Sequence, residues 1–402
     1  MEFKEAKIMN AVNSAIRGPL YVEANKMTAQ GIEVLKLNTG NPATFGFMMP
    51  DSVKKALIEN ADKATAYCAP AGMPEARKAI LDYHLGKGIR DISIDNIFIG
   101  NGVSEIAQMA VTVLVGEGDE VLVPSPGYSL WNNVIHLARA KAVQYLCDES
   151  QNWEPDVADI ESKITPNTKV LLLINPNNPT GVVYSDDVLK KLGEIAKKHD
   201  LIIFSDEIYD RLLMDGVTHT STAKLFPELP IITFNGLSKS HVVCGFRCGW
   251  MVLSGPEEFK TAIGESILKL CSMRLCGNAL AQLSIPAALE DDKYTKDMLI
   301  PGGRLYEQRE ATCRALDEIP GITYVKNKGA LYMFPKVDTE MYHITDDKEF
   351  AMNVLHETHL LFIPGSGFGW KTPDHFRLVM LPEPEQITEY LGRFKDYLAT
   401  IR

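Results

Sequence analysis

One lysine, Lys239, lies where an amine could act as a nucleophile. It belongs to Phe234-Asn-Gly-Leu-Ser-Lys-Ser240, just after an apolar run from Ile231 to Phe234 that predicts a buried strand. In open α/β sheets, ligands bind in crevices at the C-terminal ends of the strands. A lysine buried there can lose its solvation, acquire a lower pKa and attack a carbonyl group. A single loop lysine is more often simply solvated, so this interpretation depends on its neighbours.

A second stretch, Gly100-Asn-Gly-Val-Ser-Glu105, joins a predicted strand to a predicted helix. It lacks the third glycine of a dinucleotide-binding fingerprint. Small residues leading into a helix suit a single phosphate, held by backbone N–H groups and by the Ser104 hydroxyl. The alternative is an ordinary strand–helix turn with Ser104 as the N-cap. Arg247, just before the apolar run 248–253, would supply a bidentate guanidinium for the same anion.

Polar residues also follow two further predicted strands. Asn175-Pro-Asn-Asn-Pro-Thr-Gly181 fixes its backbone with two prolines and a glycine, which leaves Asn178 as a rigidly held amide. Asp206-Glu-Ile-Tyr209 places a carboxylate and a phenol close together at the end of the next strand. Taken singly, Asp206 could be a helix N-cap and Tyr209 a core aromatic. Polar turns at consecutive strand ends instead favour one common crevice.

Together these groups match the needs of one cofactor, pyridoxal 5′-phosphate. Its aldehyde takes a lysine, here Lys239, as a Schiff base, and its pyridinium nitrogen requires a carboxylate, here Asp206. Its phosphate suits a helix N-terminus and the guanidinium of Arg247, and its phenolate oxygen needs hydrogen-bond donors. A metal site is not expected, because His356 and His359 lack the i, i+4 spacing of a zinc-binding helix.

Alternating helical and apolar segments predict the sheet that positions these groups. We expect seven strands, at residues 97–100, 120–124, 142–146, 170–174, 201–205, 231–234 and 248–253. Continuous apolar strands that alternate with helices indicate a mostly parallel sheet covered on both faces. The interval from 235 to 247 is too short for a crossover helix, so the last strand should run antiparallel. The fold class is therefore α/β, with a three-layer αβα large domain.

The sequence predicts two domains and an N-terminal arm. The arm, residues 1–45, should pack with the small domain, and residues 46–290 form the large domain. Residues 291–402 form the small domain, which is α+β. Its expected elements are a long charged helix at 303–318, strands at 322–325, 330–334, 360–364 and 375–381, another helix between the strands, and a last helix from residue 384.

Composition and charge predict a globular protein of the cytoplasm. The net charge of −11 argues against nucleic-acid binding, so a few local arginines must meet any anionic substrate. The seven cysteines include no CxxC pair, which suits a reducing compartment and neither a disulfide framework nor a zinc site. The first residues lack the apolar core of a signal peptide, and no stretch is long and apolar enough to span a membrane.

The ordered motifs resemble the fold-type I pyridoxal-phosphate aminotransferases over nearly the whole chain. Within that family, the sequence is similar in particular to the bacterial glutamate–pyruvate (alanine) aminotransferases. The matching stretches are Leu37-Asn-Thr-Gly-Asn-Pro42, residues 100–105, 174–181, 204–210 and 234–239, Gly245-Phe-Arg-Cys-Gly-Trp250, Pro301-Gly-Gly-Arg-Leu-Tyr-Glu-Gln308, Gly329-Ala-Leu-Tyr-Met-Phe-Pro335 and His375-Phe-Arg-Leu378. This resemblance implies an aspartate-aminotransferase-like fold and a homodimer with shared active sites.

The resemblance also implies a role for each matching residue. Lys239 would carry pyridoxal phosphate as a Schiff base, Asp206 would pair with its pyridinium nitrogen, and Asn178 and Tyr209 would donate to its phenolate oxygen. The other implied contacts are to the phosphate (Val103, Ser104 and Arg247), to the ring face (Tyr128), to the partner subunit's phosphate (Tyr67) and to the substrate α-carboxylate (Gly40, Asn178 and Arg377). One departure is Gly236, where many relatives carry a phosphate-binding serine, which leaves that contact open.

The implied activity is transfer of an amino group between alanine/pyruvate and glutamate/2-oxoglutarate. It would follow a ping-pong mechanism with Lys239 as general base and acid. One pocket must then accept both a methyl group and a γ-carboxylate. Arg17 in the arm is the first candidate to bind that carboxylate and Arg274 the second, although each could equally be a surface or structural arginine. The alternatives are another preference (aromatic, branched-chain or methionine) or a C–S β-lyase on the same fold.

Overall fold

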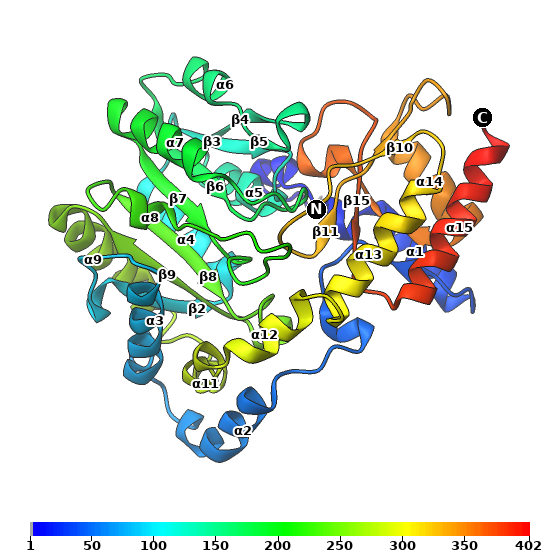
Figure 1. The fold of residues 1–402 in the computed structure, drawn as a ribbon. Coiled ribbons are helices and arrows are strands. Elements are labelled where there is room, and N and C mark those ends of the chain that lie inside the picture. The colour runs from blue at the N-terminus through cyan, green and yellow to red at the C-terminus, as the bar shows by residue number, and fades with distance from the viewer. Residues whose placement is uncertain (1–2) are drawn as a thin grey trace.

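A computed structural model describes residues 3–402, and a large mixed sheet forms the centre of its larger part (Figure 1). The eight strands lie in the order β2-β9-β8-β7-β6-β3-β4-β5. Seven of them are the predicted strands: β2 (Ile97–Asn101), β3 (Glu120–Ser125), β4 (Lys141–Asp148), β6 (Thr168–Ile174), β7 (Ile202–Asp206), β8 (Ile231–Gly236) and β9 (Cys248–Ser254). The predicted count of seven is one too low. The additional strand, β5 (Glu154–Pro155), pairs with β4 at the edge and is too short to show any periodicity.

Strand direction in this sheet follows the prediction. Strands β4, β3, β6, β7 and β8 run parallel to one another. Strand β9 runs antiparallel to both β8 and β2, which confirms the expectation from the short interval between β8 and β9. The carboxyl ends of the parallel strands therefore share one edge of the sheet, where ligands bind in folds of this kind.

Helices cover both faces of the sheet, so its strands are apolar at successive positions. Val170 and Leu172 of β6 pack with helices on one face, and Leu171 and Leu173 pack with helices on the other. The first face carries α4 (Val103–Leu114), α5 (Ser129–Leu137) and α9 (Glu257–Met273), and the second carries α6 (Val157–Ser162), α7 (Asp186–Lys198) and α8 (Thr222–Leu225). The predicted three-layer arrangement is confirmed.

Three long helices lie beside a smaller sheet in the second part of the molecule (Figure 1). They are α13 (Arg304–Asp317), α14 (Asp347–Thr358) and α15 (Pro384–Thr400). The small antiparallel sheet has the order β11 (Tyr332–Met333), β15 (Phe376–Val379), β14 (Ile363–Pro364). A further pair of strands consists of β10 (Ile322–Thr323) and β12 (Lys336–Val337).

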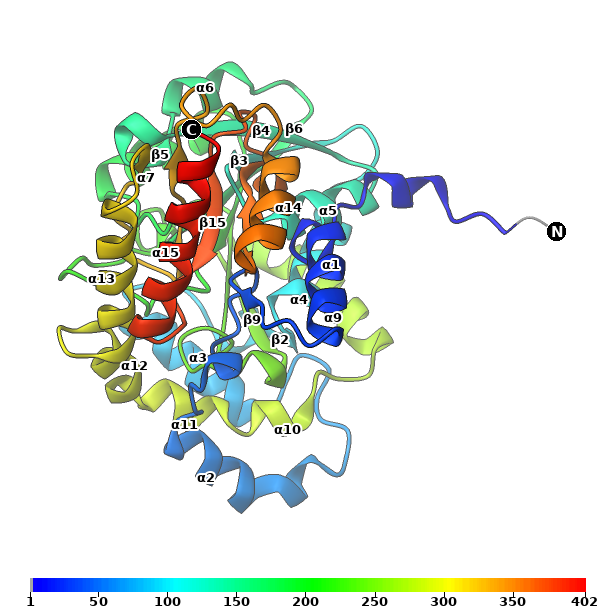
Figure 2. The ribbon, with the colours of Figure 1, turned by 90° about the vertical axis from the view of Figure 1, so that its right-hand side faces the viewer.

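The N-terminal arm packs against this smaller part. Strand β1 (Leu35–Lys36) pairs in parallel with β13 (Leu360–Leu361), and α1 (Pro19–Ala29) lies beside α14 (Figure 2). Leu20, Ala24 and Met27 of α1 belong to the same buried cluster as residues of α13, α14 and α15. Hydrophobic burial thus joins the start of the chain to its end.

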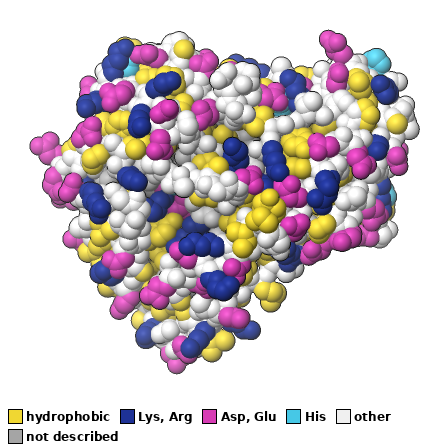
Figure 3. Space-filling model, viewed as in Figure 1, with side chains coloured by type: hydrophobic (Ala, Val, Ile, Leu, Met, Phe, Trp, Pro, Cys, Tyr) yellow, Lys and Arg dark blue, Asp and Glu magenta, His cyan; other side chains and the backbone are white. Residues whose placement is uncertain are grey.

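The surface mixes charges of both signs. Acidic and basic side chains are interspersed over the face in Figure 3, as the net charge of −11 leads one to expect. No helix among the described residues is long and apolar enough to cross a membrane. All seven cysteines are free thiols.

Candidate active site

A cavity of about 340 Å³ opens at the shared carboxyl edge of the sheet, between the sheet, the arm and the smaller part. It gathers eleven residues that the sequence predicted for the site: Arg17, Gly40, Val103, Ser104, Tyr128, Asn178, Asp206, Tyr209, Lys239, Arg247 and Arg377. These residues are far apart in the chain, and the large sheet, the arm and the smaller part together bring them into one cavity.

Lys239 follows the end of β8, and its ammonium group points into the cavity. Lys239 Nζ donates to the carbonyl oxygen of Gly40 at 2.7 Å and lies 3.8 Å from Cys244 Sγ. Burial lowers the pKa of Lys239, but the negative forms of Tyr332, Cys244 and Tyr128 raise it, and the net shift is upward. In the surroundings that the chain itself provides, burial alone thus does not decide the pKa of Lys239, because its polar neighbours oppose the effect of burial.

Asp206, at the end of β7, is a buried carboxylate that has no cationic partner among residues 3–402. It is 3% exposed. Trp131 Nε1 donates to Asp206 Oδ2 at 3.0 Å, and the backbone N–H of Ile208 donates to Oδ1 at 3.3 Å. Burial raises the pKa of Asp206 to about 6 despite these two donors. A carboxylate held this way suits a cationic ring nitrogen, which would supply the missing positive charge.

Asp206→Asn should stabilise the cofactor-free protein near neutral pH but not in acid. Because the folded-state pKa of about 6 lies above the ordinary 3.8, the stability of the fold decreases as the pH rises through this window. At 1.36 kcal/mol per pKa unit, ionisation of Asp206 costs about 3 kcal/mol at pH 7. An asparagine avoids this cost and still accepts the Trp131 hydrogen bond. Urea unfolding at about pH 4 and about pH 7.5 measures the difference, and an equal gain at both pH values would contradict the assignment.

The turn before α4 forms a cradle for an anion. Gly102 is the N-cap, with a φ of +81°, and no side chain caps the helix. Ser104 is therefore not the N-cap but lies in the first turn, where N–H groups are free for a ligand. A Cβ atom on Gly102 would come within 2.3 Å of Arg247 Nη2. The guanidinium thus lies directly over the helix N-terminus, an arrangement that suits a phosphate.

Packing explains why position 236 is a glycine. A Cβ atom on Gly236 would lie 2.6 Å from the carbonyl oxygen of Cys248 and 3.0 Å from the Cα atom of Gly249. A serine would collide with the backbone of β9. Ser238, which lines the cavity, is the hydroxyl that this turn offers in its place.

Arg377 of β15 is a buried cation that meets no carboxylate in the part of the chain that the structure describes. It is 1% exposed. Its Nη1 donates to Asn178 Oδ1 at 3.0 Å, its Nη2 donates to the carbonyl oxygen of Asn38, and its Nε lacks a partner among the described residues. Its guanidinium lies 4.5 Å from the centroid of the Tyr332 ring. This arrangement is ready for a carboxylate ligand, which would satisfy both the charge and the free donor.

Two tyrosines cover the region between Lys239 and Arg377. The hydroxyl groups of Tyr209 and Tyr332 lie 2.9 Å apart. Burial raises the pKa of Tyr209 well above its ordinary value, so its hydroxyl keeps its proton and can donate. A Cβ atom on Gly40 would lie 2.3 Å from Tyr332 Oη, which explains why this position must be a glycine.

Arg17 reaches the same cavity from the arm. It ends a short 3₁₀ helix, its side chain is exposed, and it forms no ion pair among the described residues. The arm is fixed to α5 by two reciprocal hydrogen bonds. The N–H of Asn13 donates to Asn133 Oδ1 at 2.8 Å, and Asn133 Nδ2 donates to the carbonyl oxygen of Asn13 at 2.7 Å.

Two predicted residues do not line this cavity. Arg274 instead bonds Glu105 Oε2 and the carbonyl oxygen of Ile99, both at 2.6 Å. These contacts give Arg274 a structural role in its own chain, and its assignment to a substrate carboxylate stays a prediction. Tyr67 is 79% exposed and does not line the cavity of its own chain.

Comparison with known proteins identifies the family. Residues 32–394 match the model of aminotransferase class I and II. The chain belongs to this family. It is 47% identical over 396 residues, 98% of both chains, to the glutamate-pyruvate aminotransferase AlaA of Escherichia coli (strain K12). It is 43% identical over 401 residues, 100% of this chain and 94% of the relative, to an alanine aminotransferase of Mycobacterium tuberculosis (strain ATCC 25618 / H37Rv).

Solved structures of the family share the fold. An aminotransferase from Escherichia coli has a TM-score of 0.97 at 46% identity, with 99% of both chains covered. An alanine aminotransferase from Pyrococcus furiosus has a TM-score of 0.91 at 36% identity, with 99% of this chain and 100% of that chain covered. The resemblance in the sequence motifs is thus confirmed. Aminotransferases of class I and II use pyridoxal phosphate, and the cavity has polar groups that suit each part of this molecule.

Sequence reasoning gave no role to four residues at or behind the cavity of this aminotransferase. Trp131 bonds Asp206 from the first turn of α5, and Tyr332, Ser238 and Cys244 line the cavity. Tyr332 lies within the family motif at 329–335, so the motif was recognised but its side chain received no role. Nothing local in the sequence marks Trp131, because its approach to Asp206 depends on how α5 packs against the sheet.

Proposed function

We propose that this chain is a pyridoxal-phosphate-dependent aminotransferase that moves amino groups between alanine/pyruvate and glutamate/2-oxoglutarate. The observation that carries the proposal is the convergence of a lysine, a buried carboxylate without a cation and a buried arginine without a carboxylate in one cavity: Lys239, Asp206 and Arg377. The printed names of the relatives from Escherichia coli and Mycobacterium tuberculosis support the substrate pair.

The residues that would hold the cofactor follow from their contacts. Lys239 would bind its aldehyde, Asp206 its ring nitrogen, and Tyr209 and Asn178 its phenolate oxygen. The phosphate would lie at the N-terminus of α4 with Val103, Ser104 and Arg247, and Tyr128 would cover the ring face. When bound, pyridoxal phosphate supplies an electron sink for the bond that breaks at the substrate Cα atom.

The chain's own residues would do the rest. Arg377 and Asn178, beside Gly40, bind the α-carboxylate and fix the direction of the Cα–H bond. The amine of Lys239, once free, takes the proton from the substrate Cα atom as general base. As general acid, it returns a proton to Cα in the half-reaction that forms the product amino acid. Tyr332 and Tyr128 exclude water from the ring face of the cavity.

Arg17→Ala should raise the KM for 2-oxoglutarate by about tenfold to a hundredfold and the KM for alanine by less than about twofold. The reason is that Arg17 is a cation on the cavity wall without an ion-pair partner among the described residues, so it can meet a γ-carboxylate without breaking another contact. Steady-state kinetics with each substrate varied separately measures both values. Equal changes for the two substrates, or none, would remove Arg17 from the specificity role.

A panel of amino donors with 2-oxoglutarate tests the proposed reaction. We expect pyruvate from alanine at a higher kcat/KM than any product from aromatic amino acids, branched-chain amino acids or methionine. A C–S β-lyase would instead release pyruvate and ammonia from a cysteine conjugate without any amino acceptor. If another amino acid gave the highest kcat/KM, the protein would still be an aminotransferase, but that amino acid would be its substrate.

We also propose a homodimer in which Tyr67 reaches the partner's phosphate. Its support is an exposed apolar surface formed by Tyr67, Met273, Leu275 and Leu280, of which Tyr67 and Met273 are each 79% exposed. Gln282, in the same region, bonds Cys68 Sγ at 3.4 Å and so joins the two segments. Sedimentation should give one species of twice 44.6 kDa, and a monomer would contradict the proposal.

We propose that the division of the chain follows the expected boundaries: an arm at 1–45, a large domain at 46–290 and a small domain at 291–402. The pairing of β1 with β13 supports assigning the arm to the small domain. Limited proteolysis that cut first inside the large sheet would contradict these boundaries.

Seven free thiols suit the cytoplasm, and recovery of the protein from a secreted fraction would contradict that location.

A further inference from the structure

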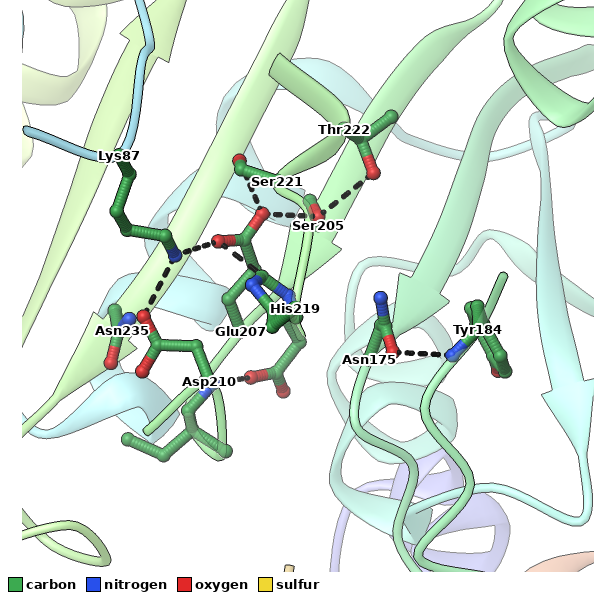
Figure 4. A network of polar contacts seen from close by, with 12 residues as sticks. Lys87, Asn175, Tyr184, Ser205, Glu207, Asp210, His219, Ser221, Thr222 and Asn235 are labelled. Atoms are coloured by element: carbon green, nitrogen blue, oxygen red, sulfur yellow. Dashed lines mark hydrogen bonds and ion pairs between the residues drawn. The ribbon is translucent and has the colours of Figure 1, made fainter. Parts of the chain in front are cut away.

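A buried cluster of charges lies beside the candidate active site, in the turn that follows β7 (Figure 4). Lys87 Nζ lies 2.7 Å from Glu207 Oε2 and 2.7 Å from Asp210 Oδ2. The side chains of Glu207 and Asp210 are 0% and 3% exposed, and that of Lys87 is 16% exposed. The proposed reaction uses none of these three residues, so their presence needs another explanation.

The turn after β7 has two faces. Asp206 and Tyr209 line the cavity, whereas Glu207 and Asp210 do not and turn toward Lys87. Lys87 itself is the C-cap of α3 (Pro74–Gly86), so the ion pairs join that helix to the turn. Glu207 and Asp210 are thus adjacent in the chain to Asp206 and Tyr209, the two residues of this turn that would hold the cofactor.

Hydrogen bonds hold the two carboxylates in place. Ser221 Oγ donates to Glu207 Oε1 at 2.6 Å, and Ser205 Oγ donates to the same atom at 3.1 Å. Tyr83 donates its hydroxyl to Asp210 Oδ2. Glu207 is therefore bonded at one oxygen by neutral hydroxyl groups and at the other by the Lys87 ammonium, whereas Tyr83 and Lys87 both bond the same oxygen of Asp210, Oδ2.

Lys87 supplies the positive charge of this cluster. Burial lowers the pKa of His219, whose Nε2 lies 4.0 Å from Glu207 Oε2, and burial lowers the pKa of His84 to about 4, so both imidazoles are neutral near pH 7. The guanidinium of Arg211 lies over the Tyr83 ring, 4.6 Å from its centroid. Among the described residues, Lys87 alone is a charged base within ion-pair distance of either carboxylate.

The charge of this cluster acts on Asp206. Burial by itself raises the pKa of Glu207, but Lys87 lowers it below its ordinary value, so Glu207 is ionised. The negative charge of Glu207 in turn contributes to the raised pKa of Asp206, after the larger effect of burial. Without Lys87, the buried Glu207 carboxylate would lose its cationic partner, and its negative charge would disfavour a second negative charge on Asp206.

We propose that Lys87 is a positioning residue for the cofactor: by neutralising Glu207 and Asp210 on one face of the turn, it keeps Asp206 ionised and oriented on the other. This inference rests on the proposed function, because it assigns to Asp206 the role of partner for the ring nitrogen. Lys87 thus contributes to cofactor binding from outside the cavity, without touching the cofactor.

The test measures the dissociation constant for pyridoxal phosphate in the full-length protein between about pH 5 and about pH 8.5. Affinity should decrease as the pH falls through the pKa of Asp206, and the pH at which half of this change has occurred is the midpoint of the titration. Lys87→Met should raise the dissociation constant at neutral pH by about tenfold or more and move this midpoint upward by about one pH unit. Glu207→Gln should move the midpoint in the opposite direction, because it removes a negative charge.

Lys260→Met is the matched control. Lys260 is also buried, at 7% exposed, and bonds Glu257 Oε2 and the carbonyl oxygen of Asp91, each at 2.7 Å, away from the cavity. This variant should lose stability but keep the wild-type midpoint. The double variant Lys87→Met/Glu207→Gln has the net charge of the wild-type cluster and should restore the midpoint to within about half a pH unit.

The inference would be overturned if pyridoxal-phosphate affinity fell equally in Lys87→Met, Glu207→Gln and Lys260→Met, with no opposite shifts of the midpoint. The cluster would then have a purely structural role. If Lys87→Met does not fold, the Glu207→Gln variant decides alone, and a midpoint that stays in place or moves upward overturns the inference. Wild-type protein that binds no pyridoxal phosphate would instead refute the proposed function, so the two failures are distinguishable.

Discussion

Replacing Lys239 by alanine lowers kcat/KM for alanine and 2-oxoglutarate by about 10⁴-fold or more. The proposal gives the Lys239 amine two tasks, attachment of the cofactor and proton transfer at the substrate Cα atom. General acid–base catalysis by itself contributes roughly 10²- to 10⁴-fold, and the loss of covalent attachment adds to this. Initial rates of pyruvate formation measure the effect.

A surface lysine provides the control for this substitution. Lys190 on α7 is 59% exposed and forms only a long ion pair with Asp187, at 3.8 Å. Lys190→Ala should keep the wild-type rate. The Lys239→Ala protein should unfold within a few degrees of wild type, because Lys239 bonds only the Gly40 carbonyl and the Cys244 thiol in the described structure. A rate within about tenfold of wild type would refute the assigned role.

Arg377→Met should lower kcat/KM by about 10³-fold for every amino-acid substrate, whichever side chain it carries. Truncating one member of a buried, hydrogen-bonded charge pair costs about 2–5 kcal/mol, and each 1.4 kcal/mol is a factor of about ten. Because all substrates share the α-carboxylate, the loss should be uniform across the donor panel. This uniformity separates Arg377 from Arg17, whose effect should follow the γ-carboxylate.

The same substitution should leave the fold intact. Burial lowers the pKa of Arg377, and no carboxylate offsets its charge in the described structure. A buried cation of this kind destabilises a protein in the absence of its ligand. We therefore expect the cofactor-free Arg377→Met protein to melt no lower than wild type. Arg393→Ala, which breaks an exposed pair with Glu389 on α15, is the control and should change neither property. A large loss of stability in Arg377→Met would favour a structural role.

The sheet and much of its polar edge could be predicted because the signals are local. A strand buried on both faces is a continuous apolar run, as at 231–234, and the residue that follows it must lie at the sheet's edge. Lys239, Asp206 and Asn178 were found in this way, from position alone. The family resemblance then added Gly40 and Arg377, whose surrounding sequence carries no chemical signal of its own.

The rest depends on packing between distant segments. Nothing near Arg274 in the sequence indicates that Glu105 lies within 2.6 Å, and this ion pair is what excludes it from the cavity. The upward shift in the pKa of Lys239 depends on Tyr332 and Cys244, which reach it through tertiary contacts. The edge strand β5 has two residues and so no period to recognise. In each case, the missing information is which side chains meet across the fold.

Borohydride reduction after incubation with pyridoxal phosphate tests the central claim most directly. Reduction converts a lysine Schiff base into a stable secondary amine, which peptide mass spectrometry can locate. We predict a single pyridoxyl-modified lysine, Lys239, with modification lost in Lys239→Ala and retained in Lys190→Ala. Label on another lysine with Lys239 unmodified, or no label at all, would contradict the account.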